Sequence, residues 1–326
     1  MASDLIAEYI WLDAGMDFRS KTRVIRGGGG GSVPLPPPPW SYDGSSTGQA
    51  SVENSEVMLK PVYCCPDPFR RIENHTCVLV LCDTWIDDTT PHPTNTRVAA
   101  SYVFDRYSDH KPLFGLEQEF FLICPGAVRN QPHFYCAPNT DTGRACVEEV
   151  FGLCIRAGLA LTGMNAEVAP WQWEYQVCDY GIRAADQLCV LRYILTTVAE
   201  KHGYDVDSRP KPFPDVNGSG CHINFSTETM RELDSEAFVA ECVAKLASDH
   251  DAHIIAYGAA NMIRLSGTNE TSCSNTFTSG KGDRTASVRI PNDTFTYIED
   301  RRPGADVDPY TATALILETV CDSNSA

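Results

Sequence analysis

Residues 114–122 read Phe-Gly-Leu-Glu-Gln-Glu-Phe-Phe-Leu, and this stretch decides the fold around it. Side chains of a β-strand alternate between the two faces of a sheet, so Glu117 and Glu119 share one face. Apolar neighbours flank both carboxylates, and two negative charges are costly there unless a cation neutralises them. Hard divalent cations such as Mg²⁺ and Mn²⁺ take carboxylate oxygens as ligands. The stretch therefore predicts a strand that carries metal ligands, with a solvated edge strand as the alternative.

The residues around this strand predict an α+β fold. Apolar residues with helical spacing occupy residues 147–161, 186–202 and 235–250. Strand-like runs occupy residues 5–25, as a pair joined by a turn, and residues 76–85, 114–123, 220–226 and 286–290. Because the helices alternate with antiparallel-looking strands, we expect an α+β second domain.

Proline, glycine and threonine mark the expected connections. The stretch 87–97 is the best domain linker, and the glycine and proline run at 27–39 predicts an extended surface loop. We therefore expect a β-rich domain at residues 1–90, a linker and lead-in at 91–110, and a second domain at 111–326.

Length and charge restrict the possible partners. The chain has 326 residues, enough for two domains, and its 26 basic and 43 acidic residues give a net charge of −17. This sign argues against nucleic acid and anionic membranes as partners, but not against small phosphorylated ligands.

The N-terminal residues lack the basic start and apolar run of a signal peptide, and no window has the ~18 uncharged apolar residues of a membrane helix. We therefore expect a cytoplasmic protein. In a reducing compartment the 14 cysteines, which form no C-x-x-C pair, are interpreted as small buried hydrophobic residues.

Further acidic residues stand in apolar surroundings. Glu167 and Glu174 lie in the aromatic-rich stretch 165–175, where solvated acidic side chains are not expected. Near the C-terminus, Glu299 and Arg301 share a face of another expected strand. The three glutamates extend the set of candidate metal ligands.

A histidine follows a glycine-rich run. Glycines in the stretch 217–220 permit close backbone approach, and the strand after them presents His222, Asn224 and Ser226 on one face. A hydrogen-bonded core histidine is the alternative interpretation of His222.

Arginines complete this chemistry in a chain that is poor in basic residues. Arg264, Arg284 and Arg289 offer guanidinium groups, whose geometry suits carboxylates and phosphates. Acidic metal ligands beside arginines are typical of phosphoryl transfer. The residue types thus favour an ATP-dependent ligase or kinase, although the chain contains no G-x-x-x-x-G-K-[ST] loop.

Taken in order, the motifs resemble glutamine synthetase of the eukaryotic type (type II). The matching pieces span nearly the whole chain: EYIWLD (8–13), KTR (21–23), WSYDGSSTGQA (40–50), PFRR (68–71), PTNTR (93–97), FGLEQEFFL (114–122), GMNAEVAPWQWEYQV (163–177), KPFPDVNGSGCHINFST (211–227), RLSGTNETS (264–272), DRTASVRIP (283–291) and YIEDRRPGADVDPY (297–310). The resemblance implies an N-terminal β-grasp domain and a catalytic domain with an antiparallel sheet and flanking helices.

The resemblance also implies the reaction and its ligands. L-Glutamate and ammonia would give L-glutamine through a γ-glutamyl phosphate, with ATP as substrate. The chain would form a homo-oligomer of stacked rings with active sites between subunits. Two ions, Mg²⁺ or Mn²⁺, would be held by two sets of side chains: Glu117, His222 and Glu299 for one, and Glu119, Glu167 and Glu174 for the other.

Substrate and catalytic roles are implied in the same way. The implied ATP-binding residues are Glu117, Glu174, Asn224, Ser226, Arg284, Arg289 and Tyr297. The implied glutamate-binding residues are Asn217, Gly218, Arg264, Arg284 and Arg301. Catalysis would fall to three residues: Asp43, which binds ammonium across a subunit interface, Glu270, which closes over the intermediate on a flap, and Arg301, close to the transferred phosphoryl group.

The chain departs from the family pattern at several positions: Leu113, Asp215, Val216, Ile263 and Asn269, together with the segments 27–39 and 125–143 and an end at Ala326. Two alternative functions remain open. One is a related γ-glutamyl ligase for a larger amine, which the retained Asp43 and Glu270 disfavour. The other is a non-catalytic structural or regulatory relative, which the intact carboxylates and arginines disfavour.

Overall fold

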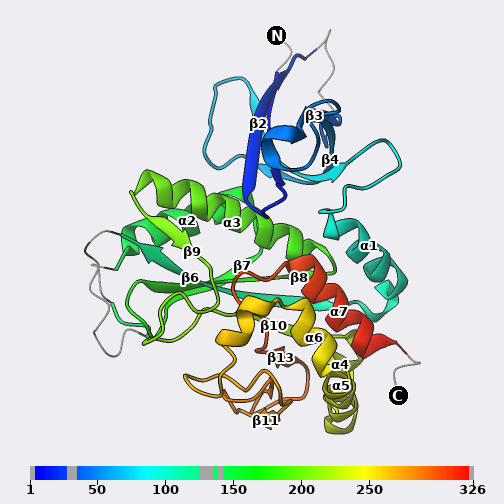
Figure 1. Cartoon of the computed structure of the whole chain (residues 1–326), viewed down its shortest axis with the longest axis vertical. Helices are drawn as coiled ribbons and strands as arrows, with labels where there is room; N and C mark the ends of the chain where they lie inside the picture. The colour runs from blue at the N-terminus through cyan, green and yellow to red at the C-terminus, as the bar shows by residue number, and fades with distance from the viewer. Residues whose placement is uncertain (1–3, 28–34, 125, 127–134, 139–141, 323–326) are drawn as a thin grey trace. The chain divides into compact units, whose positions relative to one another are not determined.

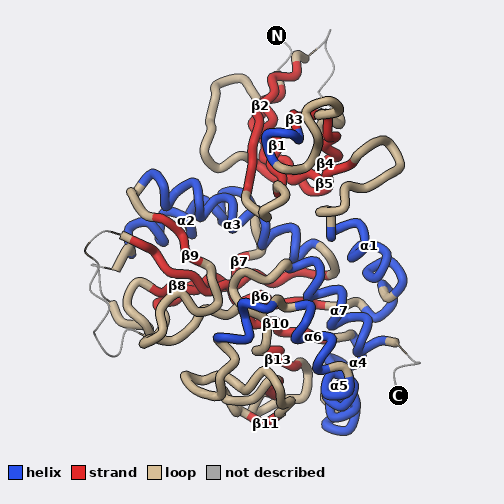
Figure 2. The backbone as a smooth tube through the Cα atoms, in the orientation of Figure 1, coloured by secondary structure: helices blue, strands red, loops and turns tan. Residues whose placement is uncertain are grey.

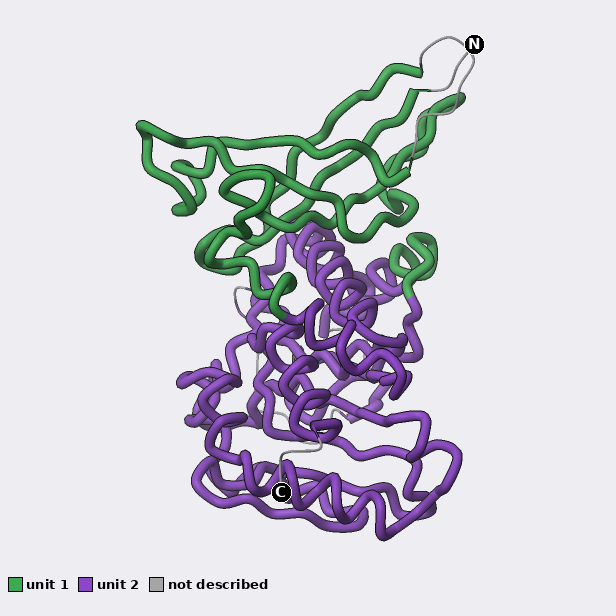
Figure 3. Tube along the Cα trace, turned by 90° about the vertical axis from the view of Figure 1, so that its right-hand side faces the viewer, with its two compact units in different colours: residues 1–99, 152–159 green, residues 100–151, 160–326 purple. Residues whose placement is uncertain are grey.

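A computed structural model describes residues 4–27, 35–124, 126, 135–138 and 142–322 of the chain (Figure 1). These residues form two compact units (Figure 3). The N-terminal unit comprises residues 1–99 and 152–159, and the large unit comprises residues 100–151 and 160–326. The connection predicted at residues 91–110 contains a helix, α1 (Thr96–Arg106). Part of the predicted loop at 27–39 and most of the departing segment 125–143 lie outside the described residues.

The N-terminal unit is built on a five-stranded sheet with strand order β2-β1-β5-β4-β3 (Figure 2). Its elements are β1 (Leu5–Leu12), β2 (Phe18–Ile25), β3 (Trp40–Asp43), the 3₁₀-helix η1 (Gly44–Thr47), β4 (Glu56–Pro66) and β5 (Thr76–Trp85). Strand β1 pairs parallel with β5 and antiparallel with β2, as a β-grasp sheet requires. Alternate β1 side chains, from Leu5 to Trp11, enter the core of this unit.

The large unit holds an eight-stranded sheet in the order β11-β12-β13-β10-β6-β8-β7, with β9 paired to β6. Its strands are β6 (Leu113–Ile123), β7 (Leu161–Ala166), β8 (Gln172–Tyr180), β9 (Asp205–Asp207), β10 (Cys221–Ser226), β11 (Ser279–Lys281), β12 (Val288–Ile290) and β13 (Ile298–Asp300). Strand β6, which contains the opening stretch, pairs antiparallel with β8, β9 and β10. It therefore forms the centre of the sheet.

Helices cover this sheet (Figure 2). They are α3 (Arg183–Lys201), α4 (Glu228–Leu233), α5 (Glu236–Ser248), α6 (His250–Ala256) and α7 (Pro309–Cys321), with the short 3₁₀-helices η2 (Ser108–His110) and η3 (Ala259–Ile263). Helix α2 (Arg144–Ala157) is divided between the two units after Phe151. Helix α3 packs on β6, β8 and β9, and α7 packs on α3, α5 and α6. Among the described residues, no helix is long and apolar enough to cross a membrane.

The observed architecture confirms the predicted α+β fold, with corrections to several boundaries. The helix expected at 147–161 ends at Ala157, because Gly158 adopts a left-handed φ of +75° that terminates it. Leu161, expected in that helix, instead begins β7. Strand β13 ends at Asp300, one residue before Arg301. The sequence patterns also missed β4, which Pro61 interrupts, β7, which Gly163 interrupts, and β8, together with the short strands β3, β9 and β11.

Candidate functional site

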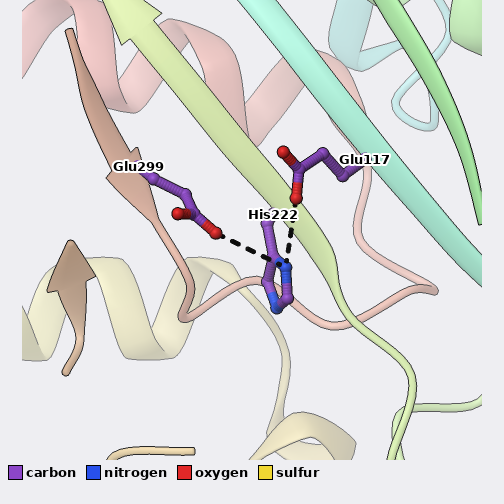
Figure 4. A group of neighbouring side chains, drawn as sticks. All are labelled: Glu117, His222 and Glu299. Carbon is purple, nitrogen blue, oxygen red and sulfur yellow. Dashed lines mark ion pairs between the residues drawn. The ribbon is translucent and has the colours of Figure 1, made fainter. Parts of the chain in front are cut away.

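Three neighbouring strands bring the first predicted metal cluster together. In the antiparallel register, His222 of β10 stands opposite Glu117 of β6, and Asn224 of β10 stands opposite Glu299 of β13. The Nδ1 atom of His222 lies 3.5 Å from Glu117 Oε2 and 3.8 Å from Glu299 Oε1 (Figure 4). Figure 4 shows all three side chains turned toward one another, although they are far apart in the sequence.

His222 has the electrostatic state of a metal ligand. Burial, assisted by the Arg301 charge, holds the pKa of His222 well below its usual range. The imidazole is therefore neutral at physiological pH and keeps a ring nitrogen free to accept. The alternative interpretation of His222, a core histidine bonded only to protein groups, fits poorly because its neighbours are three carboxylates: Glu117, Glu119 and Glu299.

The second cluster consists of Glu119, Glu167 and Glu174, one oxygen from each lying within 4.8 Å of the others. Glu119 on β6 is directly opposite Glu174 on β8, and Glu167 follows the end of β7. Burial raises the pKa of Glu167 to about 7, and burial with the Glu117 and Glu167 charges raises the pKa of Glu174 to about 8. Burial raises the pKa of Glu119 well above its usual range.

These raised pKa values follow from burial first and from the charges of neighbouring carboxylates second. The direct hydrogen-bond donors of the cluster are neutral: Asn165 Nδ2 donates to Glu167 over 2.7 Å, Gln176 Nε2 to Glu174 over 2.7 Å, and the Gly220 N–H to Glu119 over 2.9 Å. A divalent cation would neutralise the carboxylates where these hydrogen bonds do not. The donor set, three carboxylates in one group and two carboxylates with a histidine in the other, therefore fits two hard metal ions.

Arginines lie against the first cluster. Arg289 forms an ion pair with Glu299, and Arg301 Nη1 donates to Glu299 Oε1 over 2.6 Å. Arg264 is buried, and its Nη2 atom donates to the carbonyl oxygens of residues 301, 302 and 303 over 2.8–3.0 Å. Arg264 thus supports the backbone that follows β13 and also lines the cavity described below.

A cavity of about 400 Å³ opens beside the first cluster. Five of the predicted ATP-binding residues line it: Glu117, Asn224, Ser226, Arg289 and Tyr297. The remaining two lie elsewhere, since Glu174 belongs to the second cluster and Arg284 lines a different cavity. The departure at Leu113 lies in the wall of the first cavity, together with Arg231.

A narrower cavity lies beside the second cluster. It is lined by four of the predicted glutamate-binding residues, Asn217, Gly218, Arg264 and Arg301, and by Glu119, Glu167, His222 and Glu270. A glycine is required at position 218, because a Cβ atom there would lie 2.4 Å from the Pro210 carbonyl oxygen. The fifth predicted residue, Arg284, shares a neighbouring cavity of about 400 Å³ with Glu270, Tyr135 and Val168.

Asp43 belongs to the N-terminal unit, whereas the other predicted site residues belong to the large unit. Its carboxylate accepts hydrogen bonds from the Ser45 backbone N–H and hydroxyl and from the Ser46 hydroxyl. The Ser45 and Ser46 hydroxyls lower the pKa of Asp43, so the carboxylate is ionised. The turn at η1 therefore holds an exposed anion in a fixed orientation.

Comparison with known proteins decides the family. The family model for the glutamine synthetase catalytic domain matches residues 94–323. The chain belongs to the glutamine synthetase family. A putative glutamine synthetase of Acanthamoeba polyphaga mimivirus is 42% identical over 98% of this chain and 95% of its own length. Glutamine synthetase of Neurospora crassa is 43% identical over 97% and 91%, and glutamine synthetase cytosolic isozyme 1-2 of Oryza sativa is 43% identical over 97% and 93%. These relatives confirm the resemblance to the eukaryotic type.

Two residues near the glutamine synthetase site were not predicted from the sequence. Gln172 is buried, and its Nε2 atom donates to Glu119 Oε2 over 3.1 Å and to the Gly218 carbonyl over 2.9 Å. Tyr135 lines the cavity of Glu270 and Arg284. An amide or a phenol within an aromatic-rich run gives no charge signal, so neither could be distinguished before the strands were placed.

Two departures from the glutamine synthetase pattern also have defined places. Asn269 lines the narrow cavity beside Glu270, and both residues adopt positive φ angles, 53° and 61°. Asn is among the residues that tolerate this left-handed backbone. The second departure is the pair Asp215 and Val216. Lys211 Nζ donates to the Val216 carbonyl over 2.5 Å and so closes the loop that leads to Asn217.

Proposed function

We infer that this chain is a glutamate–ammonia ligase, which uses ATP to condense L-glutamate with ammonia and releases L-glutamine, ADP and phosphate. The observation that carries this conclusion is a pair of adjoining acidic clusters in a member of the glutamine synthetase family. His222 Nδ1 lies 3.8 Å from Glu119 Oε1, so the two clusters share a border. Phosphoryl transfer is catalysed mainly by positioning and charge neutralisation, for which such a site is suited.

The cavities suggest how the substrates are distributed. ATP binds in the cavity of Asn224, Ser226 and Tyr297, with its phosphates toward Glu117 and Arg289. Glu174 acts from the second cluster, and Arg284 reaches the nucleotide from the neighbouring cavity. Glutamate binds in the narrow cavity, where the ligands are Asn217, Gly218, Arg264 and Arg301, and Arg284 acts from the neighbouring cavity.

Two metal ions, Mg²⁺ or Mn²⁺, fit the clusters, one held by Glu117, His222 and Glu299 and the other by Glu119, Glu167 and Glu174. When bound, they supply positive charge that shields the phosphate oxygens and the glutamate carboxylate from each other. Arg301 and Arg289 sit against Glu299 and can turn toward the transferred phosphoryl group. Arg301 therefore stabilises the charge that develops on that group.

The second half of the reaction needs a base and protection from water. The glutamate γ-carboxylate takes the terminal phosphoryl group of ATP, and ammonia then attacks the carbonyl carbon of this acyl phosphate while phosphate leaves. Glu270, at the tip of a loop beside the narrow cavity, accepts a proton from ammonium and covers the intermediate. Asp43, ionised and exposed, binds ammonium from the N-terminal unit of an adjacent subunit.

This last role requires an assembly. We propose that the chain forms a homo-oligomer of stacked rings in which Asp43 of one subunit completes the site of the next. We also propose a cytoplasmic location, because similar relatives in Oryza sativa and Arabidopsis thaliana are named cytosolic isozymes.

A coupled assay of ADP release tests the function directly. Purified protein is incubated with glutamate, ammonium, ATP and Mg²⁺, and each component is then omitted in turn. We expect ADP release and glutamine formation to require all four. Absence of ADP release from folded protein would contradict the ligase assignment, and faster release with methylamine or ethylamine than with ammonium would instead indicate a ligase for larger amines.

A further inference from the structure

A buried polar network lies behind the strand that carries Glu299. Asp300 and Arg302 alternate with Glu299 and Arg301, so they point away from the clusters and into the protein. Arg302 Nη2 and Asp300 Oδ2 form an ion pair at 2.7 Å, and both side chains are almost fully buried. Arg302 Nε also donates to Asp300 Oδ1 over 2.9 Å, so the contact is bidentate and fixes the backbone next to Glu299.

Two histidines of α6 extend this network, and the hydrogen bonds determine their tautomers. Arg302 can only donate, so the His250 Nδ1 atom, 3.2 Å from Arg302 Nη1, accepts, and His250 Nε2–H donates to the Ser274 carbonyl over 3.0 Å. Tyr257 donates to Asp300 over 2.8 Å, so its oxygen accepts from His253 Nδ1 over 2.7 Å. Both imidazoles are neutral, because burial and the Arg302 charge lower their pKa values.

Ser274 forms the C-terminal base of the loop that carries Glu270. The loop, residues 264–274, is closed by two backbone hydrogen bonds: Ser274 N to the Leu265 carbonyl over 3.0 Å and Gly267 N to the Ser272 carbonyl over 3.2 Å. At the other base, Arg264 donates to the carbonyl oxygens of residues 301–303. Both ends of the loop are thus attached to the segment after β13, directly through Arg264 and through the His250 side chain.

We propose that His250 is a positioning residue that couples the Glu270 loop to the strand carrying Glu299 and to the segment directly after it. The inference rests on the proposed function, because it gives the loop the task of covering the acyl phosphate. His250 contacts no predicted ligand, and it acts by transmitting the position of Arg302 to the Ser274 carbonyl. Nucleotide and metal bound at Glu299 therefore bias the loop toward the closed position through three groups: the Arg302 guanidinium, the His250 imidazole and the Ser274 carbonyl.

The position of the loop determines whether ammonia or water attacks the γ-glutamyl phosphate. In a closed site ammonia attacks the γ-glutamyl phosphate and glutamine forms. In an open site water attacks the same carbonyl carbon, the bond to the phosphate oxygen breaks, and glutamate and inorganic phosphate result. Loss of His250 should increase the second route, because the loop base loses its attachment while the clusters keep all their ligands.

Three substitutions separate positioning from packing. His250→Phe keeps the aromatic contact with Phe277 but removes both hydrogen bonds, whereas His250→Gln retains an acceptor and a donor about as far apart as the two ring nitrogens. His110→Phe, at an exposed position, is the matched control. We expect the ADP released in excess of glutamine, divided by the glutamine formed, to rise by about fivefold in His250→Phe, the factor for losing the one hydrogen bond that reaches the Ser274 carbonyl. The ratio should be near the wild-type value in His250→Gln and His110→Phe.

A measurement of loop exchange tests the coupling independently of the reaction products. Amide hydrogen exchange is followed in residues 264–274 with and without Mg²⁺ and ADP. We expect nucleotide to slow exchange in this loop in the wild type and in His250→Gln, and not in His250→Phe. The proposal would be overturned by an unchanged ratio of excess ADP to glutamine in folded His250→Phe. It would also be overturned if amide exchange in the wild-type loop were the same with and without nucleotide. Wild-type protein without ligase activity would instead overturn the proposed function.

Discussion

Replacing Glu174 with glutamine should stabilise the metal-free protein at alkaline pH. The carboxylate oxygens of the second cluster lie within 4.8 Å of one another, and the hydrogen-bond donors around them are neutral. Two unit charges at that separation repel by about 3 kcal/mol at an effective dielectric constant of ~20. Glutamine keeps the shape of the side chain and removes one of the charges.

The sign of the pH dependence follows from the raised pKa values. A carboxylate whose folded-state pKa lies above its unfolded value of ~4.3 stabilises the fold below that value and loses this contribution as pH rises through the folded pKa. For Glu167 and Glu174 these folded values are about 7 and about 8. The wild-type protein without metal should therefore lose stability between pH 5 and pH 9, and the variant should lose less.

Calorimetry in EDTA measures this difference. At pH 9 the variant should unfold about 6 °C above the wild type, at roughly 2 °C per kcal/mol. The difference should nearly vanish at about pH 4, where Glu174 is largely protonated in both the folded and the unfolded protein. Added Mn²⁺ should stabilise the wild type more than the variant. Glu241→Gln, at an exposed helix position, is the control. If the variant is no more stable than the wild type at pH 9, the second cluster does not hold mutually repelling carboxylates.

Three further predictions address other parts of the chain. Glu299→Ala should abolish Mg²⁺-dependent γ-glutamyl hydroxamate formation, and near-normal activity would contradict the assignment of Glu299 as a metal ligand. Asp43→Ala should impair use of ammonia, and mixing it with the Glu299→Ala protein should restore part of the activity if sites form between subunits. Asp308→Ala removes the N-cap acceptor of the Tyr310 N–H in α7 and should cost about 1 kcal/mol in urea unfolding, with no change in the slope of the transition.

Local patterns in the sequence were sufficient for the elements with simple periodicity. Strand β5 has the predicted bounds, Thr76–Trp85, because its continuous apolar run at 77–82 lies between polar segments at 73–75 and 87–90. Strand β8 was not recognised, although Gln172, Glu174 and Gln176 alternate there with the apolar residues 173, 175 and 177. The period of two is present in this stretch, but its polar face is largely buried, and Glu174 is interpreted as a ligand without a strand being assigned around it.

The candidate site was predictable as a set of residue types and through family resemblance, but its grouping was not predictable from spacing. Glu117 and Glu119 lie on one strand face, yet they enter different clusters. Glu117 is paired in register with His222 on one neighbouring strand, and Glu119 with Glu174 on the other. Because β6 lies between β10 and β8, its two carboxylates join different clusters, one with each neighbouring strand.

The sequence by itself determined the chemistry of this protein: buried carboxylates, a histidine and arginines in a family order that specifies the reaction. These are properties of residue identity and of alternation along single strands, which local sequence contains. The family resemblance implied which carboxylates share a cluster, and the tertiary structure supplied the strand register that brings them together. Only the tertiary structure decided that the Glu270 loop is attached through His250 and Arg264 to the segment after β13. The clusters and this attachment depend on strand register and on contacts between residues tens of positions apart, where no local pattern records the partner.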